Sequence, residues 1–354
     1  MAVQHLLAAF EGWRAQGKPL VLATIVETLG STYSKAGTQM LIEPGGDFEG
    51  LVSGGCLEGD LVEHARGVLE SRQPKQVTYD MRDEEADQVW GLGLGCNGAV
   101  RIFLQPLDPA TGYEPFMSMT GLMAGARRGA YALVIASASA AVPAAAWMVA
   151  DSAGTMSGSE ANAFLREACA AAATAASVYK IRHDGAELEI FAAPVPVIPK
   201  VLLLGAGPDV IPLARMGEML GWRVTVADHR PAYVERLRQM VAADVRETAA
   251  DRLADTLDLD VFDACVVMSH HYLTDLEYLR SLAQSRIAYI GMLGPEKRRT
   301  RLFDDLGAAQ QLLQGRAYGP VGLDIGADDA DSIALSIAAQ IQAVLKGAAG
   351  GHLC

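Results

Sequence analysis

Residues 201–230 read VLLLGAGPDVIPLARMGEMLGWRVTVADHR, and this stretch is the strongest indication of the fold of the C-terminal half. An apolar run leads into Gly205 and Gly207, which match the first two positions of a GxGxxG pattern, and a helical pattern follows. Val210 stands where the third glycine would be, and the next apolar run ends at Asp228. That carboxylate follows the glycines by about 20 residues, where a ribose-binding acid is expected. The stretch therefore predicts a Rossmann-like, doubly wound parallel sheet of the α/β class.

Three later segments of this half carry further candidate binding residues. DACVVMSHH ends an apolar run at His270, AYIGMLG carries Gly291, and the glycine-rich loop before the last helical pattern carries Asp324. Ligands of open α/β sheets bind at the carboxyl ends of the strands. The expected binding residues of this half are Gly205, Gly207, Asp228, His270, Gly291 and Asp324. NAD(P) is one candidate ligand, and Asp324 is also expected to cap the last helix.

The proline-rich stretch AAPVPVIPK, residues 192–200, indicates an extended linker between two domains. A chain of 354 residues is long enough for two or three domains, since a domain has roughly 150 residues. We expect an N-terminal domain over 1–193, a linker over 194–199, a Rossmann-like domain over 200–346 and a flexible tail over 347–354.

The N-terminal half contains two similar stretches, which begin at Leu20 and Tyr131. Each reads as two apolar strands, a glycine-containing turn and a helical pattern. Each then closes with a similar strand, NGAVRIFLQPL at 97–107 and DGAELEIFAAPV at 184–195. This pattern predicts a duplicated α/β domain of two β-β-α-β copies, of which the second is degenerate. The alternative is that two ordinary α/β segments look alike by chance.

The first copy carries a glycine and cysteine motif, GGCLEGD at 54–60, which the second copy lacks. Gly54 and Gly55 permit positive φ and the close approach of a ligand. Cys56 precedes a helical pattern, whose free N–H groups favour anions, and Glu58 lies in the first turn, where a carboxylate offsets the helix dipole. The motif predicts either a ligand-binding site of Gly54, Gly55, Cys56 and Glu58 with a thiol that touches the ligand or metal, or a small buried cysteine at a helix cap with the carboxylates as capping groups.

A second glycine loop with cysteine, GLGLGCNG at 91–98, closes the first copy. If Cys96 lies near Cys56, the two thiols could hold a soft metal or a sulfur centre, or form a reversible disulfide. A buried cysteine beside a β-bulge is the structural alternative. The hydroxyl-rich loop LGSTYSKAGT at 29–38 adds Ser31 as a candidate contact for phosphate or carboxylate.

Composition excludes several classes of partner. Asp and Glu number 42 against 29 Lys and Arg, for a net charge of −13. That charge argues against nucleic acid and against an anionic membrane surface, since both are bound through Lys and Arg. The five cysteines contain no CxxC, which is typical of neither a disulfide scaffold nor a zinc ribbon and fits a reducing cytoplasm. We expect no signal peptide, and no membrane span in the uncharged stretch 129–150, which lacks the Leu and Ile density of an inserted helix.

The motifs above, together with VADHRP, YIGMLG and GLDIGA, occur in one order over most of the chain and resemble the XdhC/CoxI family. Members of this family are accessory proteins for the maturation of xanthine dehydrogenase and related molybdenum hydroxylases. The resemblance implies a chaperone that binds a molybdenum–pterin cofactor and cooperates with a cysteine desulfurase, which supplies the terminal sulfido ligand. Delivery to a client enzyme of the xanthine dehydrogenase type would follow. The resemblance thus implies a maturation factor more than a catalyst.

On this resemblance, Cys56 is the residue expected to touch the metal or its sulfur, with Gly54, Gly55 and Cys96 shaping the site. The chain departs from the family pattern in two places. The GAG turn continues as Pro208-Asp209, and the strand that often ends in His-Asp reads Ser-His-His. Both departures concern the ligand of the Rossmann-like domain.

Two other functions stay open on the residues alone. An NAD(P)-dependent oxidoreductase would use Gly205, Gly207 and Asp228, although the chain has no Tyr-x-x-x-Lys proton donor. A sulfur-transfer enzyme would use Cys56 as a persulfide. A homodimer is the expected oligomer, because twofold dimers are the commonest assembly.

Overall fold

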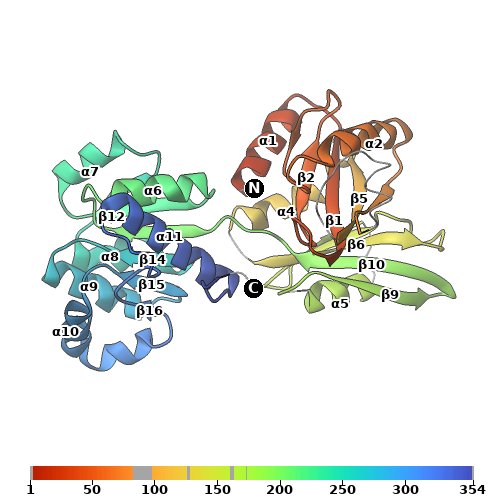
Figure 1. Ribbon diagram of the computed structural model, residues 1–354. Helices are drawn as coiled ribbons and strands as arrows, with labels where there is room; N and C mark the ends of the chain where they lie inside the picture. Colours follow the sequence, from red (N-terminus) through yellow and green to blue (C-terminus); the bar gives the residue numbers. More distant parts are fainter. Residues whose placement is uncertain (1–2, 83–97, 126–127, 160–162, 173, 353–354) are drawn as a thin grey trace. The chain divides into compact units, whose positions relative to one another are not determined.

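The computed structural model describes residues 3–82, 98–125, 128–159, 163–172 and 174–352. The chain divides into two compact units, Met1–Val197 and Ile198–Cys354, and the division falls within the proline-rich stretch (Figure 1). The first unit has two sheets and the second has one, and each unit has its own hydrophobic cores.

The first unit contains two five-stranded antiparallel sheets with the same strand order (Figure 1). The first sheet runs β3 (Phe48–Glu49), β2 (Gln39–Ile42), β1 (Leu20–Gly30), β5 (Gly98–Leu107), β4 (Lys75–Asp80). The second runs β8 (Met156–Gly158), β7 (Trp147–Asp151), β6 (Gly129–Ser137), β10 (Ala186–Pro194), β9 (Ser177–His183). One helix follows the third strand of each copy, α2 (Glu58–Ser71) and α5 (Ala163–Ala171). The predicted duplication is confirmed, and each copy has two strands more than the β-β-α-β pattern.

Matching irregularities show how closely the copies correspond. β1 is bulged after Ile25 and β6 after Val134, at the same place in each sheet. Beside each bulge the chain turns back through a left-handed residue, Gly37 with φ 93° and Ala145 with φ 69°. The N–H of Gly37 donates to the carbonyl oxygen of Ile25 and that of Ala145 to Val134, both at 2.8 Å. The same turn is therefore built once with glycine and once without it.

The two sheets pack face to face around a shared core. Leu20 and Leu22 of β1 face this core, whereas Val21 and Ala23 face α2, because successive strand residues point to opposite faces. The second sheet also has one face toward the shared core, and α5 packs on its other face. Helices α1 (Val3–Ala15) and α4 (Phe116–Met123) close the shared core. The unit thus has four layers, helix, sheet, sheet and helix (Figure 1).

One ion pair joins equivalent positions of the two copies. Arg101 of β5 and Glu189 of β10 lie on the inner faces of their sheets, and two guanidinium N–H groups donate to the carboxylate at 2.8 and 2.9 Å. The side chains are 19% and 13% exposed. The hydrogen bonds to Glu189 raise the pKa of Arg101. Arg101 also pairs with Glu27 at 3.1 Å.

The second unit is built on one six-stranded parallel sheet, in the order β13, β12, β11, β14, β15, β16. Its strands are β11 (Lys200–Leu204), β12 (Arg223–Asp228), β13 (Asp244–Glu247), β14 (Ala264–Val267), β15 (Tyr289–Met292) and β16 (Ala317–Tyr318). Its α-helices are α6 (Val210–Met219), α7 (Pro231–Arg238), α8 (Leu253–Thr256), α9 (Tyr272–Ala283), α10 (Glu296–Leu306) and α11 (Ala330–Lys346). Helices α6, α7 and α11 pack on one face and α8, α9 and α10 on the other. This is the doubly wound order of Rossmann folds, as predicted.

The cap of the last helix differs from the prediction. Asp329, not Asp324, caps α11, because its carboxylate accepts the N–H of Ser332 at 2.7 Å. The Ser332 hydroxyl in turn accepts the N–H of Asp329 at 3.1 Å, which completes a capping box. Several carboxylates precede this helix, and the three-residue spacing to Ser332 selects Asp329.

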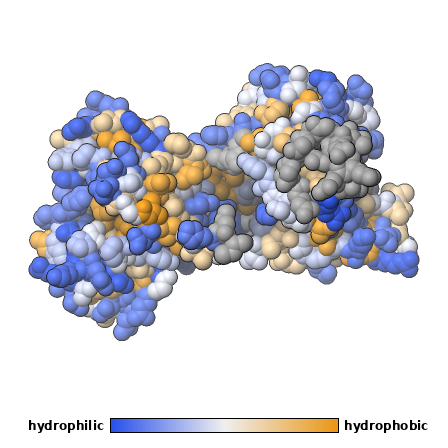
Figure 2. Space-filling model, viewed as in Figure 1, coloured by the Kyte–Doolittle hydropathy of each residue, from blue (hydrophilic) through white to orange (hydrophobic). Residues whose placement is uncertain are grey.

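The surface in view is mainly hydrophilic, and apolar side chains gather along α6 and α11 of the second unit (Figure 2). The exposed large apolar residues on or beside these helices are Met219, Leu220 and Leu335. The uncharged stretch 129–150 forms strand β6 and most of β7. Within the described part of the chain, no helix combines the length and apolar character needed to cross a bilayer.

The ion pair between Arg101 and Glu189 predicts that its two single variants lose different amounts of stability. Arg101→Met should lower the free energy of unfolding by about 1–3 kcal/mol, because it leaves the mostly buried carboxylate of Glu189 without its partner. Glu189→Met should cost less, because Glu27 still pairs with Arg101. Urea unfolding of both variants and of the double variant measures this, and the double variant should recover part of the loss. If the two single variants lost equal stability, and the loss of the double variant were the sum of the two, the proposed coupling between Arg101 and Glu189 would be contradicted.

Candidate functional site

The cysteine loop, residues 50–57, joins β3 to α2 in the first copy. Cys56 in this loop is a free cysteine and is exposed. Gly54 and Gly55 have φ of 76° and 112°, so the backbone path needs glycine at both positions. In the second copy, the sequence at the corresponding place reads SGSEAN (157–162), which has neither the cysteine nor the paired glycines. The cysteine motif is therefore particular to the first copy.

The carboxylate of Glu58 points into the cysteine loop and is buried, with the residue 1% exposed. Its Oε1 accepts the backbone N–H groups of Val52 and Ser53, each at 2.9 Å. Its Oε2 accepts the N–H groups of Gly55 at 3.0 Å and Leu57 at 3.2 Å, and the Ser53 hydroxyl at 2.5 Å. Both oxygens are thus engaged inside the loop and determine its shape.

These hydrogen bonds decide the charge of Glu58. Burial by itself would raise the pKa of the carboxyl, but the hydrogen bonds from Ser53 and the loop amides outweigh it and hold the pKa below the usual 4.5. The group is therefore ionised at neutral pH. Glu58 was predicted to contact a ligand, but in the structure its oxygens turn toward the protein's own donors.

Ser53 is a residue of the loop that the sequence interpretation missed. Its hydroxyl oxygen accepts the N–H groups of Cys56 at 3.1 Å and Leu57 at 2.7 Å, while its proton goes to Glu58. It therefore satisfies amides that precede α2, as capping side chains do. A serine shortly before a helix that begins with Glu is the signal that could have indicated it.

A chain of polar side chains links the first turns of α2 to β4. The Tyr79 hydroxyl donates to Oδ2 of Asp60 at 2.5 Å, and Nε2 of His64 lies 3.4 Å from the same oxygen. Nζ of Lys75 lies 2.9 Å from Nδ1 of His64. Burial, together with the bond to Asp60, raises the pKa of Tyr79. Asp60 and His64 stand four residues apart, which was the available sequence signal.

The hydroxyl-rich loop lies against the cysteine loop. A Cβ atom at Gly54 would lie 3.2 Å from the ring of Tyr33, so glycine lets this ring approach the backbone. The Ser34 hydroxyl donates to the carbonyl oxygen of Leu51 at 3.3 Å. Ser31, predicted to contact an anion, is exposed in the same hydroxyl-rich loop. The structure thus brings two of the predicted motifs of the first copy together.

Two further predictions concern metal binding in the first copy. Cys96, predicted as a second thiol of the site, lies outside the described residues. Cys56 was predicted to be the metal contact. Among the described residues, no three or more His, Cys, Asp or Glu side chains are grouped as a metal site.

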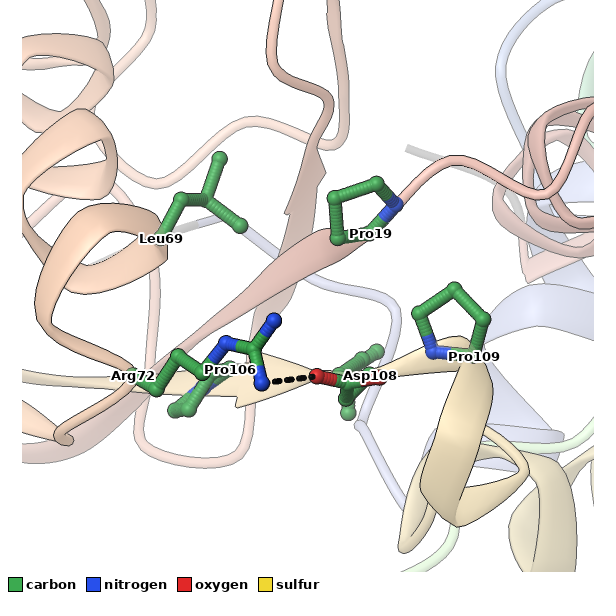
Figure 3. Close-up of a pocket in the computed structure, with 7 residues that line it drawn as sticks. Pro19, Leu69, Arg72, Pro106, Asp108 and Pro109 are labelled. Atoms are coloured by element: carbon green, nitrogen blue, oxygen red, sulfur yellow. Dashed lines mark ion pairs between the residues drawn. The ribbon is translucent and has the colours of Figure 1, made fainter.

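A separate hollow of about 260 Å³ lies at the other end of α2 (Figure 3). Its lining residues are Pro19, Leu69, Arg72, Pro106, Leu107, Asp108 and Pro109. Arg72, which caps α2, pairs with Asp108 at 3.8 Å. Since a helix of this length spans about 20 Å, the hollow is remote from the cysteine loop. It contains none of the predicted binding residues.

The glycine turn of the second unit follows β11. A Cβ atom at Gly205 would lie 2.5 Å from the carbonyl oxygen of Met268, so the close approach of β14 requires this glycine. A Cβ atom at Gly207 would lie 2.5 Å from Oδ1 of Asp209. Oδ2 of Asp209 pairs with Nε2 of His270 at 2.7 Å. The structure brings Gly207 and His270 together around a carboxylate that was not among the predicted binding residues.

Asp228, predicted to bind a ribose, is completely buried at the end of β12. Its Oδ2 accepts the N–H of Ala206 at 2.7 Å and Nη2 of Arg230 at 2.6 Å, and its Oδ1 accepts Nε of Arg230 at 2.9 Å. Burial would raise the pKa of Asp228, but the bonds from Arg230 and Ala206 outweigh it and lower the pKa. Both oxygens therefore serve the protein's own donors.

The remaining two predicted residues lie toward the other edge of the sheet. Gly291 is in β15, where a Cβ atom would collide with Cγ2 of Val321. Asp324 is exposed in the loop after β16. The base of that loop is held by Gln340 of α11, whose Oε1 accepts the N–H of Gly322 at 2.8 Å. Glycine at 291 thus lets the loop that carries Asp324 pack closely against the strand.

Comparison with protein families gives a match in each unit. Residues 13–80 match the XdhC and CoxI family, and residues 201–341 match the XdhC Rossmann domain.

Similar proteins extend these matches over nearly the whole chain. A protein of Bacillus subtilis (strain 168), named as a probable subunit of xanthine dehydrogenase, is 31% identical over 323 residues, which are 91% of this chain and 92% of that protein. The molybdenum cofactor insertion chaperone PaoD of Escherichia coli (strain K12) is 31% identical over 94 residues, 27% of this chain and 28% of that protein. A crystal structure described as a xanthine dehydrogenase from Bacillus halodurans has a TM-score of 0.79 and 26% identity, over 98% of this chain and 96% of that chain. The chain belongs to the XdhC and CoxI family.

Proposed function

We propose that this chain is a maturation factor that binds a molybdenum–pterin cofactor as cargo and supports its insertion into an enzyme of the xanthine dehydrogenase type. The proposal rests mainly on the cysteine loop. There the buried carboxylate of Glu58 accepts hydrogen bonds from the glycine turn, and Cys56 is exposed. The relatives support it, because one is named for xanthine dehydrogenase and another for molybdenum cofactor insertion.

The residues of the first copy suit such a cargo. A thiol is a soft ligand, so Cys56 would contact the metal or its sulfur. Gly54 and Gly55 carry no side chains and have positive φ, so they would let the cofactor approach the loop closely. The exposed Ser31 hydroxyl would face the phosphate. Glu58 would act as a positioning residue, because its oxygens are engaged within the loop. A carrier must release its cargo, which favours modest affinity.

Delivery of the cofactor requires partners. We propose a client enzyme of the xanthine dehydrogenase type and a cysteine desulfurase that supplies the terminal sulfido ligand before insertion. We also propose that the chain works as a homodimer, on the general frequency of twofold assemblies. A reducing cytoplasm suits an exposed free thiol such as Cys56.

Sulfur transfer through a Cys56 persulfide is the second candidate, and the exposed free thiol favours it. The chain would be incubated with a cysteine desulfurase and cysteine, and the peptide that contains Cys56 would then be weighed by mass spectrometry. One added sulfur on this peptide supports sulfur transfer. An unmodified peptide, in a chain that still binds the cofactor, supports a carrier alone.

Cofactor binding should depend on Cys56. The full chain, mixed anaerobically with released molybdenum cofactor, should elute from gel filtration with molybdenum and with oxidised-pterin fluorescence. Cys56→Ala should lose most of both signals, because the thiol contact is removed. Cys169→Ala is the matched control, since Cys169 is buried on α5 of the second copy. If Cys56→Ala and Cys169→Ala gave equal molybdenum and pterin signals, the cofactor would bind elsewhere in the chain. A wild-type peak without molybdenum and pterin would contradict the proposed function.

Glu58→Gln should destabilise the first unit by about 1–3 kcal/mol at pH 7, because an amide nitrogen would face backbone donors. The Glu58 pKa is lowered in the folded chain, so its contribution is complete above pH 4.5 and is lost as the pH falls below that value. The difference in the free energy of unfolding between wild type and Glu58→Gln should therefore become smaller at acidic pH. Glu63→Gln on the same helix is the control, since Glu63 is 64% exposed. Thermal unfolding from pH 3 to 7 measures both, and equal stability of the two variants at pH 7 would refute the role of Glu58.

A further inference from the structure

The glycine turn of the second unit lies where dinucleotides bind in doubly wound folds. There the pyrophosphate rests on the backbone of the turn and on the N-terminus of the next helix, and the second glycine leaves room for it. The corresponding residues here are Gly207 and the start of α6. The fold therefore suggests NAD(P), and the fit of that ligand can be judged from the side chains around the turn.

The space beside Gly207 is occupied by the protein itself. Oδ1 of Asp209 lies 2.5 Å from the position of a Cβ atom at Gly207, so this carboxylate fills the room that the glycine leaves. Oδ2 of Asp209 is bonded to Nε2 of His270 at 2.7 Å. His270 adopts φ 61°, a left-handed conformation that is uncommon for a residue with a side chain. The carboxylate is thus held in place from the end of the neighbouring strand.

The chemistry of the turn also opposes a phosphate. Asp209 is the N-cap of α6, so a negative charge stands where the anionic ligand would be placed. Pro208 has no N–H to donate. Val210, at the position of the third glycine, is completely buried and brings bulk to the helix–strand contact.

The nucleoside side of the site is closed by independent contacts. Asp228, the expected ribose acceptor, is completely buried and is bonded to Ala206 and Arg230. The Arg230 guanidinium lies 3.9 Å above the ring of Tyr233. The hollow between the turn and α7 measures about 20 Å³ and is bordered by Ala206, Pro208 and Tyr233, among others. That volume suits about one water molecule and not an adenine ring.

We propose that Asp209, held by His270, takes the place of a pyrophosphate and excludes NAD(P) from the glycine turn of the second unit. NAD(P), suggested by the fold, does not fit the residues present. Asp209 is then a specificity-determining residue, which keeps a doubly wound unit from binding the dinucleotides that its topology favours. This inference does not depend on the cysteine loop or on the proposed cargo.

The test is a titration of the full chain with NADH and with NADPH, followed by the fluorescence of the reduced nicotinamide. Wild type should show a dissociation constant weaker than about 1 mM. Asp209→Gly removes both the charge and the bulk, and should bind at least about tenfold more tightly, with a gain that shrinks as salt screens the phosphate charge. Asp209→Asn keeps the size and should recover only part of the gain.

Asp255→Asn is the matched control, since it removes one charge from the same unit at a residue that is 72% exposed. Thermal unfolding of every variant confirms that it is folded before titration. Micromolar binding by wild type that is unchanged in Asp209→Gly would overturn the proposal. A folded Asp209→Gly that binds no better than Asp255→Asn would also overturn it, because another residue would then exclude the ligand. Neither result bears on molybdenum cofactor binding.

Discussion

A single buried carboxylate organises the candidate site. The backbone amides between Val52 and Leu57 precede the hydrogen-bonded part of α2, and buried N–H groups need an acceptor. Glu58 supplies one from the first turn of the helix, with both oxygens inside the loop. Because these bonds outweigh the cost of burying a charge, the carboxylate stays ionised, while Cys56 is left on the surface.

The duplicated sheets show which features the fold itself needs. Both copies keep the strand order, the bulge and the left-handed turn, even where Ala145 replaces the Gly37 of the first copy. The sequence of the second copy has no counterpart of the GGCLEGD motif, although its sheet has the same strand order. In the second unit, the doubly wound topology favours a dinucleotide site. Asp209 and Arg230 occupy the places in that site where the ligand would bind. In each unit a carboxylate determines the shape of the candidate site, Glu58 in the first and Asp209 in the second.

Sequence patterns predicted the duplication of the first unit and the doubly wound sheet of the second, but not the directions of the key side chains. Alternating apolar residues and glycine turns follow from backbone geometry, so the repeat and the doubly wound sheet could be read from them. A Glu in a first helical turn reads equally well as a dipole partner or a ligand contact, and only the loop path shows that Glu58 turns inward. Likewise, the pairing of Asp209 with His270 joins residues that follow two different strands, and no local pattern in the sequence indicates it. Asp324 was mistaken for the cap because neighbouring carboxylates compete for that position.

We expect the cofactor to lie on the cysteine loop. The most direct measurement is the rate of alkylation of Cys56 by iodoacetamide, with and without bound molybdenum cofactor, followed by peptide mass spectrometry under anaerobic conditions. The buried Cys169 and Cys265 serve as internal references for unfolding. Bound cofactor should slow the alkylation of Cys56 while Cys169 and Cys265 stay unreactive. An unchanged rate at Cys56, with cofactor shown to be bound, would contradict it.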